Sequence, residues 1–280
     1  MNNVERTVSS AVVTQPPRLT VGWLTCLALC LPLPTAAADL QPRTVQAYEK
    51  YADGATRDFV ARARKEAGKR RCEGVMTGHA GGGDGIIDVP DGLIHHWVGT
   101  AFVKGATLRQ VSDVARDYPG YSKVFKAVKS SKVLSHEGDV YRVLIRIEEG
   151  ELGVNAVLEV RSTVDYRTLT DGSVSAVSRS EEIREVDNAG GPRESYRPVG
   201  RDNGYLWRAH TFSHFTADTD GVFIVMETLG LSRPFPRMTW WFLEPIARRM
   251  GRKSVEGSLG EFLTGIRSSA GLPAPKTSCS

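Results

Sequence analysis

Histidines are the side chains of this sequence that could do the most varied chemistry, and four of them occur in two close pairs. His95 and His96 are adjacent in a stretch that we expect to be a β-strand. Because successive strand residues point to opposite faces, these two cannot bind one metal ion together. His210 and His214 alternate with apolar residues, so we expect both to face solvent. A metal site built from them would need a third ligand, for which His136 and Glu227 are the candidates, and we do not favour such a site.

Hydroxyl side chains form a second set of candidate functional groups. Four of them lie on the same face as the apolar residues of the expected strands: Ser162, Thr211, Ser213 and Thr228. Such hydroxyls can bind oxygen atoms of a ligand, or they can bind one another and buried water. A general acid or base would need a buried carboxylate or histidine with a tuned pKa. Glu182 and Arg184 share the alternation of inward-facing residues, but a β-bulge would turn them outward, and we favour the surface for both.

Other kinds of site find little support. The segment 78–85 is rich in glycine, yet it fits neither a P-loop nor G-x-G-x-x-G, so a linker is favoured. No Ser-His-Asp set and no base-reading module is present. The 36 basic and 32 acidic residues give a formal net charge of +4, which is too mild to indicate nucleic-acid binding. We therefore expect no catalytic residue, no metal and no cofactor.

The N-terminal region has the pattern of a secretory signal peptide. Arg18 precedes a short apolar run that ends in Pro32 and Pro34, and small residues follow at Ala36 and Ala38. The run is too short for a membrane-spanning helix, which needs about 20 residues. We expect cleavage after residue 38 and export to the periplasm or the medium. Cys72 and Cys279 then remain, and they either pair or stay free.

Hydrophobic periodicity divides the rest of the chain into helices and strands. An amphipathic helix is expected over about 43–69, before the linker that ends at 91. A strand over 93–103 precedes a helix capped by Thr107 and a short second helix. Strands are then expected over 141–147, 154–164, 173–186, 205–215 and 222–226. A segment broken at Pro245, a last helix capped by Ser254 and a disordered tail over 269–280 complete the chain.

These elements predict an α+β fold in which one antiparallel sheet has an apolar face to cover. A sheet of this length twists and curls, and we expect it to wrap around the last helix. Curled sheets of this kind tend to leave a mostly apolar interior pocket. The alternative is a filled core, with function on the outer surface.

Short motifs in the expected domain resemble the START-like (SRPBCC) superfamily, within it the polyketide cyclase and coenzyme Q-binding group. The run from Gly105 to Tyr121 is similar to the first helix of that family and to the aspartate-tyrosine pair that ends this helix, here Asp117 and Tyr118. The stretches 94–102 and 204–208 look like pieces of exported members. The resemblance covers about residues 92–268. It implies a helix-grip fold, in which a curved antiparallel sheet wraps around a long C-terminal helix and two short helices follow the first strand. Members bind sterols, lipids, quinones, plant hormones or polyketides, and some are cyclases.

The sequence therefore predicts a protein that carries or sequesters a lipid-like, quinone-like or polyketide-like molecule in an internal cavity. An enzyme of the cyclase or hydrolase kind, using the same cavity, is the alternative. The residues expected to line the cavity or its mouth are Tyr118, Tyr121, Phe125, Leu158, Ser162, Trp207, Thr211, Phe215, Met226 and Trp241. Transient contact with a membrane surface is expected through Trp240, Trp241, Arg248 and Arg249.

Overall fold

The computed structural model describes residues 38–67, 73–80, 84–151, 154–234 and 240–275, without the side chains of Ala38, Glu151, Val154 and residues 240–250. Its centre is a ten-stranded antiparallel sheet in which eight strands follow the order β2-β4-β12-β11-β8-β7-β6-β5. Strand β3 also pairs with β4, and the short β9 pairs with β8. A separate two-stranded ladder joins β1 to β10.

The bounds of the elements follow chain order. The strands are β1 (Ala38–Asp39), β2 (Val75–His79), β3 (Ile86–Val89), β4 (Gly92–Lys104), β5 (Val128–Glu137), β6 (Val140–Glu151), β7 (Val154–Thr168), β8 (Val174–Asp187), β9 (Ser195–Tyr196), β10 (Arg201–Asp202), β11 (Arg208–Asp218) and β12 (Gly221–Ser232). The helices are α1 (Pro42–Ala67), α2 (Leu108–Arg116), the 3₁₀ turn η1 (Tyr118–Gly120), α3 (Tyr121–Val124) and α4 (Trp240–Ala270).

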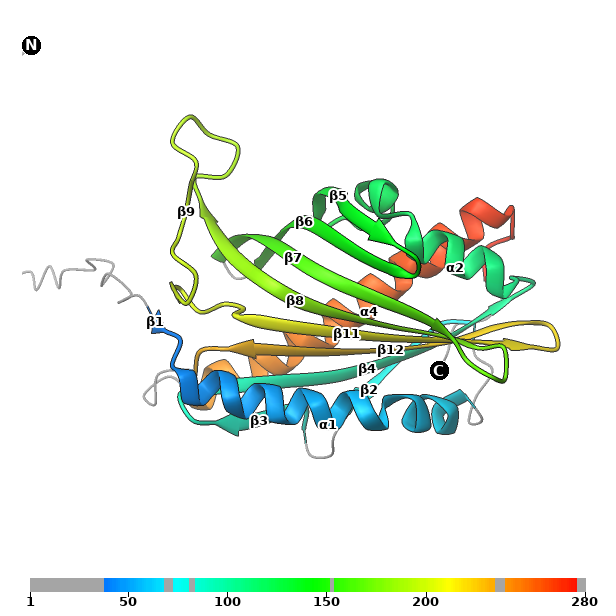
Figure 1. Ribbon diagram of the computed structural model, residues 1–280, viewed down its shortest axis with the longest axis horizontal. Coiled ribbons are helices and arrows are strands. Elements are labelled where there is room, and N and C mark those ends of the chain that lie inside the picture. Colours follow the sequence, from blue (N-terminus) through cyan, green and yellow to red (C-terminus); the bar gives the residue numbers. More distant parts are fainter. Residues whose placement is uncertain (1–37, 68–72, 81–83, 152–153, 235–239, 276–280) are drawn as a thin grey trace, which may run out of the picture. The chain divides into compact units, whose positions relative to one another are not determined.

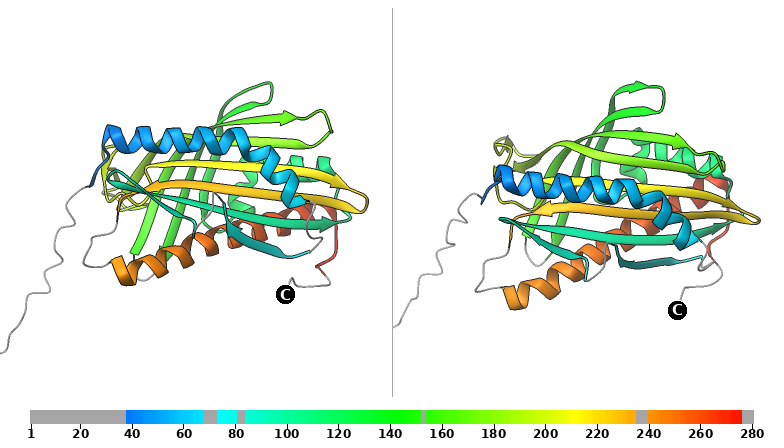
Figure 2. Two further views of the ribbon diagram at one scale, coloured as in Figure 1. Left: turned by 90° about the horizontal axis from the view of Figure 1, so that it is seen from below. Right: turned by 60° about the horizontal axis from the view of Figure 1, so that its bottom comes forward.

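The sheet is curved, and helices cover both of its faces. Figures 1 and 2 show α4 on the concave side and α1 on the opposite, convex side. A hydrophobic cluster fills part of the concave side, where Phe215 and Ile224 of the sheet meet Leu259 and Ile266 of α4. A second cluster lies on the convex side, where Tyr48 and other residues of α1 cover the sheet. We call these the concave cluster and the convex cluster.

The structure confirms the predicted fold class, an α+β fold with a curved antiparallel sheet and a long C-terminal helix. Helix α2 begins where expected, because the Thr107 side chain accepts the backbone N–H of Gln110 and the Gln110 side chain accepts that of Thr107. This reciprocal capping box satisfies two N–H groups that a helix start leaves unpaired. The Asp117 carboxylate then accepts the Gly120 N–H, and the chain turns out of the helix.

Several boundaries differ from those predicted. Helix α4 continues through Pro245 and Ser254, so Ser254 is not a cap. Proline removes only one backbone hydrogen bond, and packing of the apolar stripe of α4 on the sheet outweighs that loss. The sequence does not predict strand β5, because as an edge strand it is mostly exposed and lacks apolar alternation. Strands β2 and β3 flank the Gly-rich segment that was expected to be linker alone.

Some predictions fall outside the described residues. These are residues 1–37 of the predicted signal peptide 1–38, the cysteines at 72 and 279, and residues 276–280 of the predicted tail. None of the described helices is long and apolar enough to cross a bilayer.

Candidate ligand-binding site on the concave face

One end of the concave face is closed by Tyr118, Tyr121 and Tyr166, whose hydroxyl groups are all hydrogen-bonded. The hydroxyls of Tyr118 and Tyr166 lie 2.9 Å apart, and Tyr166 donates to the Ala115 carbonyl at 2.7 Å. Tyr121 donates to the same carbonyl at 2.6 Å. The Tyr121 ring also contacts Phe125, edge to face, with the ring centroids 4.9 Å apart. These contacts fill the space beneath α2. We call Tyr118, Tyr121 and Tyr166 the plug.

The tyrosines of the plug are neutral at physiological pH. Burial raises the pKa of Tyr166 to about 12, and burial also raises the pKa of Tyr118 and of Tyr121 well above the ordinary value. A phenol in such surroundings donates or accepts hydrogen bonds but does not ionise. The plug therefore has a structural role in the described geometry.

The other part of the concave face has a floor of small and hydroxyl side chains. Thr211 of β11 lies opposite Thr228 of β12 on one side and opposite Ser178 of β8 on the other. In the next row, Ser213 lies opposite Met226. All five side chains are only half-buried, although they lie on the inner side of the sheet. We call this region the open floor.

Described residues of helix α4 contact the sheet on two sides of the open floor. At Gly99 of β4 an added Cβ would lie 2.8 Å from Val255 Cγ1 and 3.0 Å from Leu259 Cδ2, so the helix touches the strand backbone. On the far side of the floor, the hydroxyl of Ser254 donates to the Glu149 carboxylate of β6 at 3.4 Å. The helix thus spans from β4 to β6, and the open floor lies between these supports.

The ionisable groups near the open floor are few. His95 lies on the concave side with Nε2 2.8 Å from the Ser232 hydroxyl, and burial lowers the pKa of the imidazole to about 4. Glu185, opposite Leu158, accepts the backbone N–H groups of Asn203 and Tyr205. Among the described residues, no lysine or arginine lies on the concave side of β4, β12, β11, β8 or β7.

The residues predicted to line the cavity divide into three groups. Tyr118, Tyr121, Phe125 and Phe215 belong to the closed end or pack against the concave cluster. Thr211 and Met226 are on the open floor, and Ser162 and Leu158 are buried on the same face nearby. The side chain of Trp241 lies outside the described residues, as do those of Trp240, Arg248 and Arg249.

Trp207 lies elsewhere than predicted. It belongs to the convex cluster beneath α1, and its indole N–H donates to Asp202 at 2.9 Å. The alternation that placed it beside Phe215 does not apply, because Trp207 precedes the first residue of β11, Arg208. The backbone turns at that point, so its side chain is not bound to the alternation of the strand.

The prediction that His210 and His214 face solvent is wrong. His210 is 6% exposed and His214 is 1% exposed, because α1 covers their face of β11. The Tyr48 hydroxyl lies 2.9 Å from Nδ1 of His210 and donates to the Leu229 carbonyl at 3.2 Å. Neither ring nitrogen of His214 has a hydrogen-bond partner among the described residues. Burial, helped by the charge of Arg179, lowers the pKa of His210 to about 4, and burial also lowers that of His214.

His96 takes part in a buried ion-pair network on the same convex face. The Glu227 carboxylate lies 3.0 Å from Nε2 of His96 and 2.7 Å from a terminal nitrogen of Arg62 in α1. Burial alone would raise the pKa of Glu227, but the hydrogen bonds from His96 and Arg62 outweigh it and hold the pKa below its ordinary value. Nδ1 of His96 is 3.0 Å from the Tyr51 hydroxyl of α1. The two adjacent histidines thus point to opposite faces of the sheet.

Sequence reasoning missed this convex network because its members are far apart in the chain. Arg62 and Glu227 are separated by 165 positions, and neither belongs to a short motif. One signal was present: Glu227 stands in an otherwise apolar strand, and a charge in such a place needs a partner. Among the described residues, no group of three or more histidine, cysteine, aspartate or glutamate side chains is arranged to hold a metal ion.

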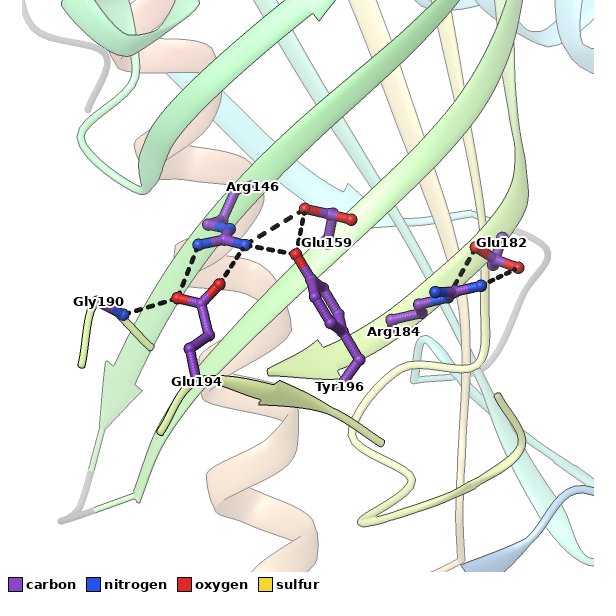
Figure 3. Close-up of polar contacts among 7 residues, drawn as sticks. All are labelled: Arg146, Glu159, Glu182, Arg184, Gly190, Glu194 and Tyr196. Carbon is purple, nitrogen blue, oxygen red and sulfur yellow. Dashed lines mark hydrogen bonds and ion pairs between the residues drawn. The ribbon is translucent and has the colours of Figure 1, made fainter. Parts of the chain in front are cut away.

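Glu182 and Arg184 lie on the convex face, where they pair at 2.8 Å. Arg161 of β7 pairs with Glu182 and Ser162 pairs with Ser180, so Glu181 is an extra residue of β8. This bulge reverses the parity of Glu182 and Arg184. Figure 3 shows this pair beside a larger group in which Arg146 contacts Glu159 and Glu194. That group fastens the loop after β8 to the outside of the sheet, away from the open floor.

An open pocket of about 530 Å³ lies at the start of α1, away from the concave face. Its walls come from the segments around β1, β10 and the first turn of α1. It is lined by Asp39, Leu40, Gln41, Pro42, Val45, Val199, Gly200, Arg201 and Arg208. Because Arg208 and Val45 lie on the α1 side of the sheet, this pocket does not communicate with the open floor.

Comparison with known proteins gives likenesses among solved structures only. No family model matches the chain, and no curated protein matches it. A STAR-related lipid transfer protein from Xanthomonas axonopodis is 16% identical over 68% of this chain and 98% of its own, with a TM-score of 0.46. The Zhui aromatase/cyclase from a Streptomyces species is 15% identical over 64% and 94%, with a TM-score of 0.40. A START superfamily protein from Mycobacterium smegmatis is 8% identical over 61% and 97%, with a TM-score of 0.39. The chain is thus similar to START-like structures, at a level that indicates no particular activity.

Proposed function

We propose that the protein binds a hydrophobic, lipid-like molecule between the concave face of its sheet and α4, and that it does so outside the cytoplasm. The open floor is the observation that supports binding. Small side chains such as Ser213 and Thr211 remain half-buried on the inner side of a curved sheet, between the contacts that described residues of α4 make with β4, with β6 and with the concave cluster. Interior surface of this kind is available to a ligand, whereas close-packed cores leave no such room.

The surrounding surface suits an apolar ligand. Ile145 and Ile147 of β6 and Val160 of β7 share the concave face with the open floor and are also only half-buried. Covering such side chains contributes about 25 cal/mol for each Å² of apolar surface, before the cost of ordering the ligand is deducted. Apolar burial would therefore supply most of the affinity.

The export part of the proposal rests on the signal-peptide pattern of residues 1–38. We expect the protein in the exported fraction of its host to begin at Asp39. Intact-mass measurement of that fraction tests this. A full-length chain that stays in the cytoplasm would overturn the proposed location and leave ligand binding to be judged separately.

Extraction of the purified protein with organic solvent, followed by mass spectrometry, tests ligand binding. We expect a lipid-like molecule in near-stoichiometric amount, and we expect Nile red to bind the delipidated protein. The variant Ser213→Phe, which fills the open floor, should lose both. Ser135→Phe is the matched control, because Ser135 is exposed on the edge strand β5. Absence of any extractable lipid together with no Nile red binding would overturn the proposal.

A hydrolase is the second candidate function, and the contact between His95 and Ser232 is the observation that favours it. A neutral imidazole 2.8 Å from a serine hydroxyl is a geometry in which a base can activate a nucleophile, although the Ser232 hydroxyl also donates to the Arg233 carbonyl at 3.2 Å. Among the described residues, however, Nδ1 of His95 has no carboxylate partner to orient the ring. Hydrolysis of a p-nitrophenyl ester of a long-chain acid, lost in Ser232→Ala, would favour this candidate. Equal rates in the two proteins would exclude a role for Ser232.

A further inference from the structure

The hydroxyl groups of the open floor have no partner within the described part of the chain, and this distinguishes them from the tyrosine hydroxyls of the interior. Thr211, Thr228 and Ser178 lie side by side on three neighbouring strands, yet none makes a side-chain hydrogen bond with another described residue. By contrast, the three tyrosines of the plug are all hydrogen-bonded. The open floor therefore offers unused donors and acceptors inside an apolar surround.

The three hydroxyls form a row that crosses the strands at right angles. Adjacent strands are about 4.8 Å apart, so the row from β12 to β8 spans roughly 10 Å. Ser213 adds a fourth hydroxyl in the neighbouring row, next to Met226. A ligand lying across the floor thus meets hydroxyl groups near its middle, with apolar side chains on both sides.

A pure hydrocarbon would be a poor match for this row. Covering a hydroxyl with an apolar group removes its hydrogen bonds to water and replaces them with nothing. A ligand oxygen placed over the row would restore the lost hydrogen bond. Each such match is worth about tenfold in affinity.

A negatively charged group is also a poor match. No described lysine or arginine lies on the concave side of β4, β12, β11, β8 or β7, and the described arginines of β7 and β8, such as Arg161 and Arg184, point to the convex side. His95 is uncharged near neutral pH, because burial lowers its pKa. A carboxylate or phosphate buried on the floor would find no counter-charge on these strands, and burying an unpaired charge is strongly unfavourable.

We propose that the ligand part lying on the open floor is uncharged and carries a hydroxyl, carbonyl or ester oxygen that binds the row of Thr211, Thr228 and Ser178. This inference rests on the proposed function and narrows it to neutral oxygen-bearing lipids. A hydrocarbon would leave the hydroxyl row unpaired, and an anionic headgroup would find no counter-charge on the strands that carry the row. The hydroxyl row determines which lipids bind more tightly than others, while the apolar side chains around it contribute affinity for every lipid-like ligand.

Three probes of equal chain length test the inference: a pyrene-labelled fatty alcohol, the corresponding fatty acid and the corresponding alkane. Fluorescence titration of the delipidated full-length protein at pH 7.5 gives the three dissociation constants. We expect the alcohol to bind about tenfold more tightly than the alkane, and also more tightly than the acid. The double variant Thr211→Val, Thr228→Val should remove most of the advantage of the alcohol and leave alkane binding unchanged or improved.

Thr216→Val is the matched control, because Thr216 is on the same strand as Thr211 but on the convex face. It should leave all three dissociation constants unchanged. Urea unfolding of every variant verifies that it is folded. Equal binding of the three probes, or an unchanged preference in the double variant, would overturn the inference while ligand binding itself stands. If none of the probes binds, the proposed function fails and this inference fails with it.

Discussion

The two faces of the sheet differ in how far their polar side chains have hydrogen-bond partners within the chain. On the convex face, Glu227 is held by Arg62 and His96, and His210 is held by Tyr48, all beneath α1. On the concave face, the hydroxyls of the open floor have no partner within the described part of the chain and remain half-exposed. Buried polar groups in proteins are nearly always paired. The convex face is therefore built as a sealed interior, in which the ring nitrogens of His214 and the hydroxyl of Thr216 are exceptions, whereas the open floor is a surface that a ligand can cover.

The helices α1 and α4 pack on the sheet to different extents, and this explains why the two faces differ. Helix α1 buries Tyr48, Phe59 and Ala63 directly against the sheet, which excludes water and makes an unpaired charge there costly. Helix α4 touches β4 at Gly99 and reaches β6 through Ser254, with the floor between. Side chains on the floor can still meet solvent, so they need no partner within the protein.

The largest effect is expected where the convex network is broken. Glu227→Ala leaves Arg62 and His96 without their carboxylate, and removal of one partner from a buried ion pair costs about 3–5 kcal/mol. Urea unfolding of the variant and the wild type measures the loss. Glu181→Gln is the control, because its partner Arg142 is exposed and surface pairs contribute little. Equal losses in the two variants would show that the convex face is no more sealed than the surface.

Acid should loosen the convex face. His210 and His214 have lowered pKa values in the folded state, so the unfolded chain takes up their protons first as the pH falls. Their contribution to stability is therefore intact above about pH 6.5 and is lost as the pH falls toward 4. For His210, whose pKa is lowered to about 4, the loss approaches about 3 kcal/mol at the acid limit.

Urea unfolding at pH 7 and pH 5 measures this dependence, and amide exchange in α1 locates it. His210→Phe should flatten the pH profile, since its partner Tyr48 can still donate to the Leu229 carbonyl. Asp53 and Arg179, the charged groups near His210, should be left in place. An unchanged pH profile in the variant would show that His210 does not cause the loss of stability in acid.

A medium effect is expected where α4 touches the sheet. Gly99→Ala would put a methyl group 2.8 Å from Val255 and 3.0 Å from Leu259, both of which are buried. Overpacking of this kind costs about 1–3 kcal/mol, and thermal or urea unfolding measures it. Gly78→Ala is the control, because its added methyl group would sit 3.6 Å from Val98 in ordinary contact. A neutral Gly99→Ala would mean that α4 is held less closely than the geometry indicates.

The smallest effect is expected on the open floor. Thr228→Val removes a hydroxyl that bonds no other described residue, so the free energy of unfolding should change by no more than about 0.5 kcal/mol. Tyr166→Phe removes a hydroxyl that bonds Tyr118 and the Ala115 carbonyl, and it should cost about 1–3 kcal/mol. Urea unfolding of both variants compares the two ends of the concave face. A large loss in Thr228→Val would show that the floor has a structural role after all.

Much of the fold was predictable from the sequence because its signals are local. The stripe that includes Tyr48 and Phe59 predicts α1, and Thr107 predicts the start of α2. Alternation along β7 placed Leu158 and Ser162 on one face correctly. Each of these signals depends on residues within a few positions of one another, so no distant part of the chain can change it.

The candidate site was predicted only in part. Thr211, Ser213 and Thr228 were expected on the inner face, and the strand register places them there. Trp207 was assigned to the same face but lies beneath α1, and Ser178 was not recognised as part of the hydroxyl row. Helices lie over both faces of β11, so its alternation could not tell which face was inside and which was exposed.

What the sequence by itself determined is most of the helices and strands, with β2, β3 and β5 as exceptions, and most of the residues that share a face within each predicted strand. Periodicity and capping carry that information, and both act over a few residues. Only the tertiary structure decided which helix covers which face, where a bulge turns Glu182 outward, and that Arg62 meets Glu227. Those outcomes depend on contacts between segments far apart in the chain. A local sequence pattern does not specify which distant segment packs on a given face.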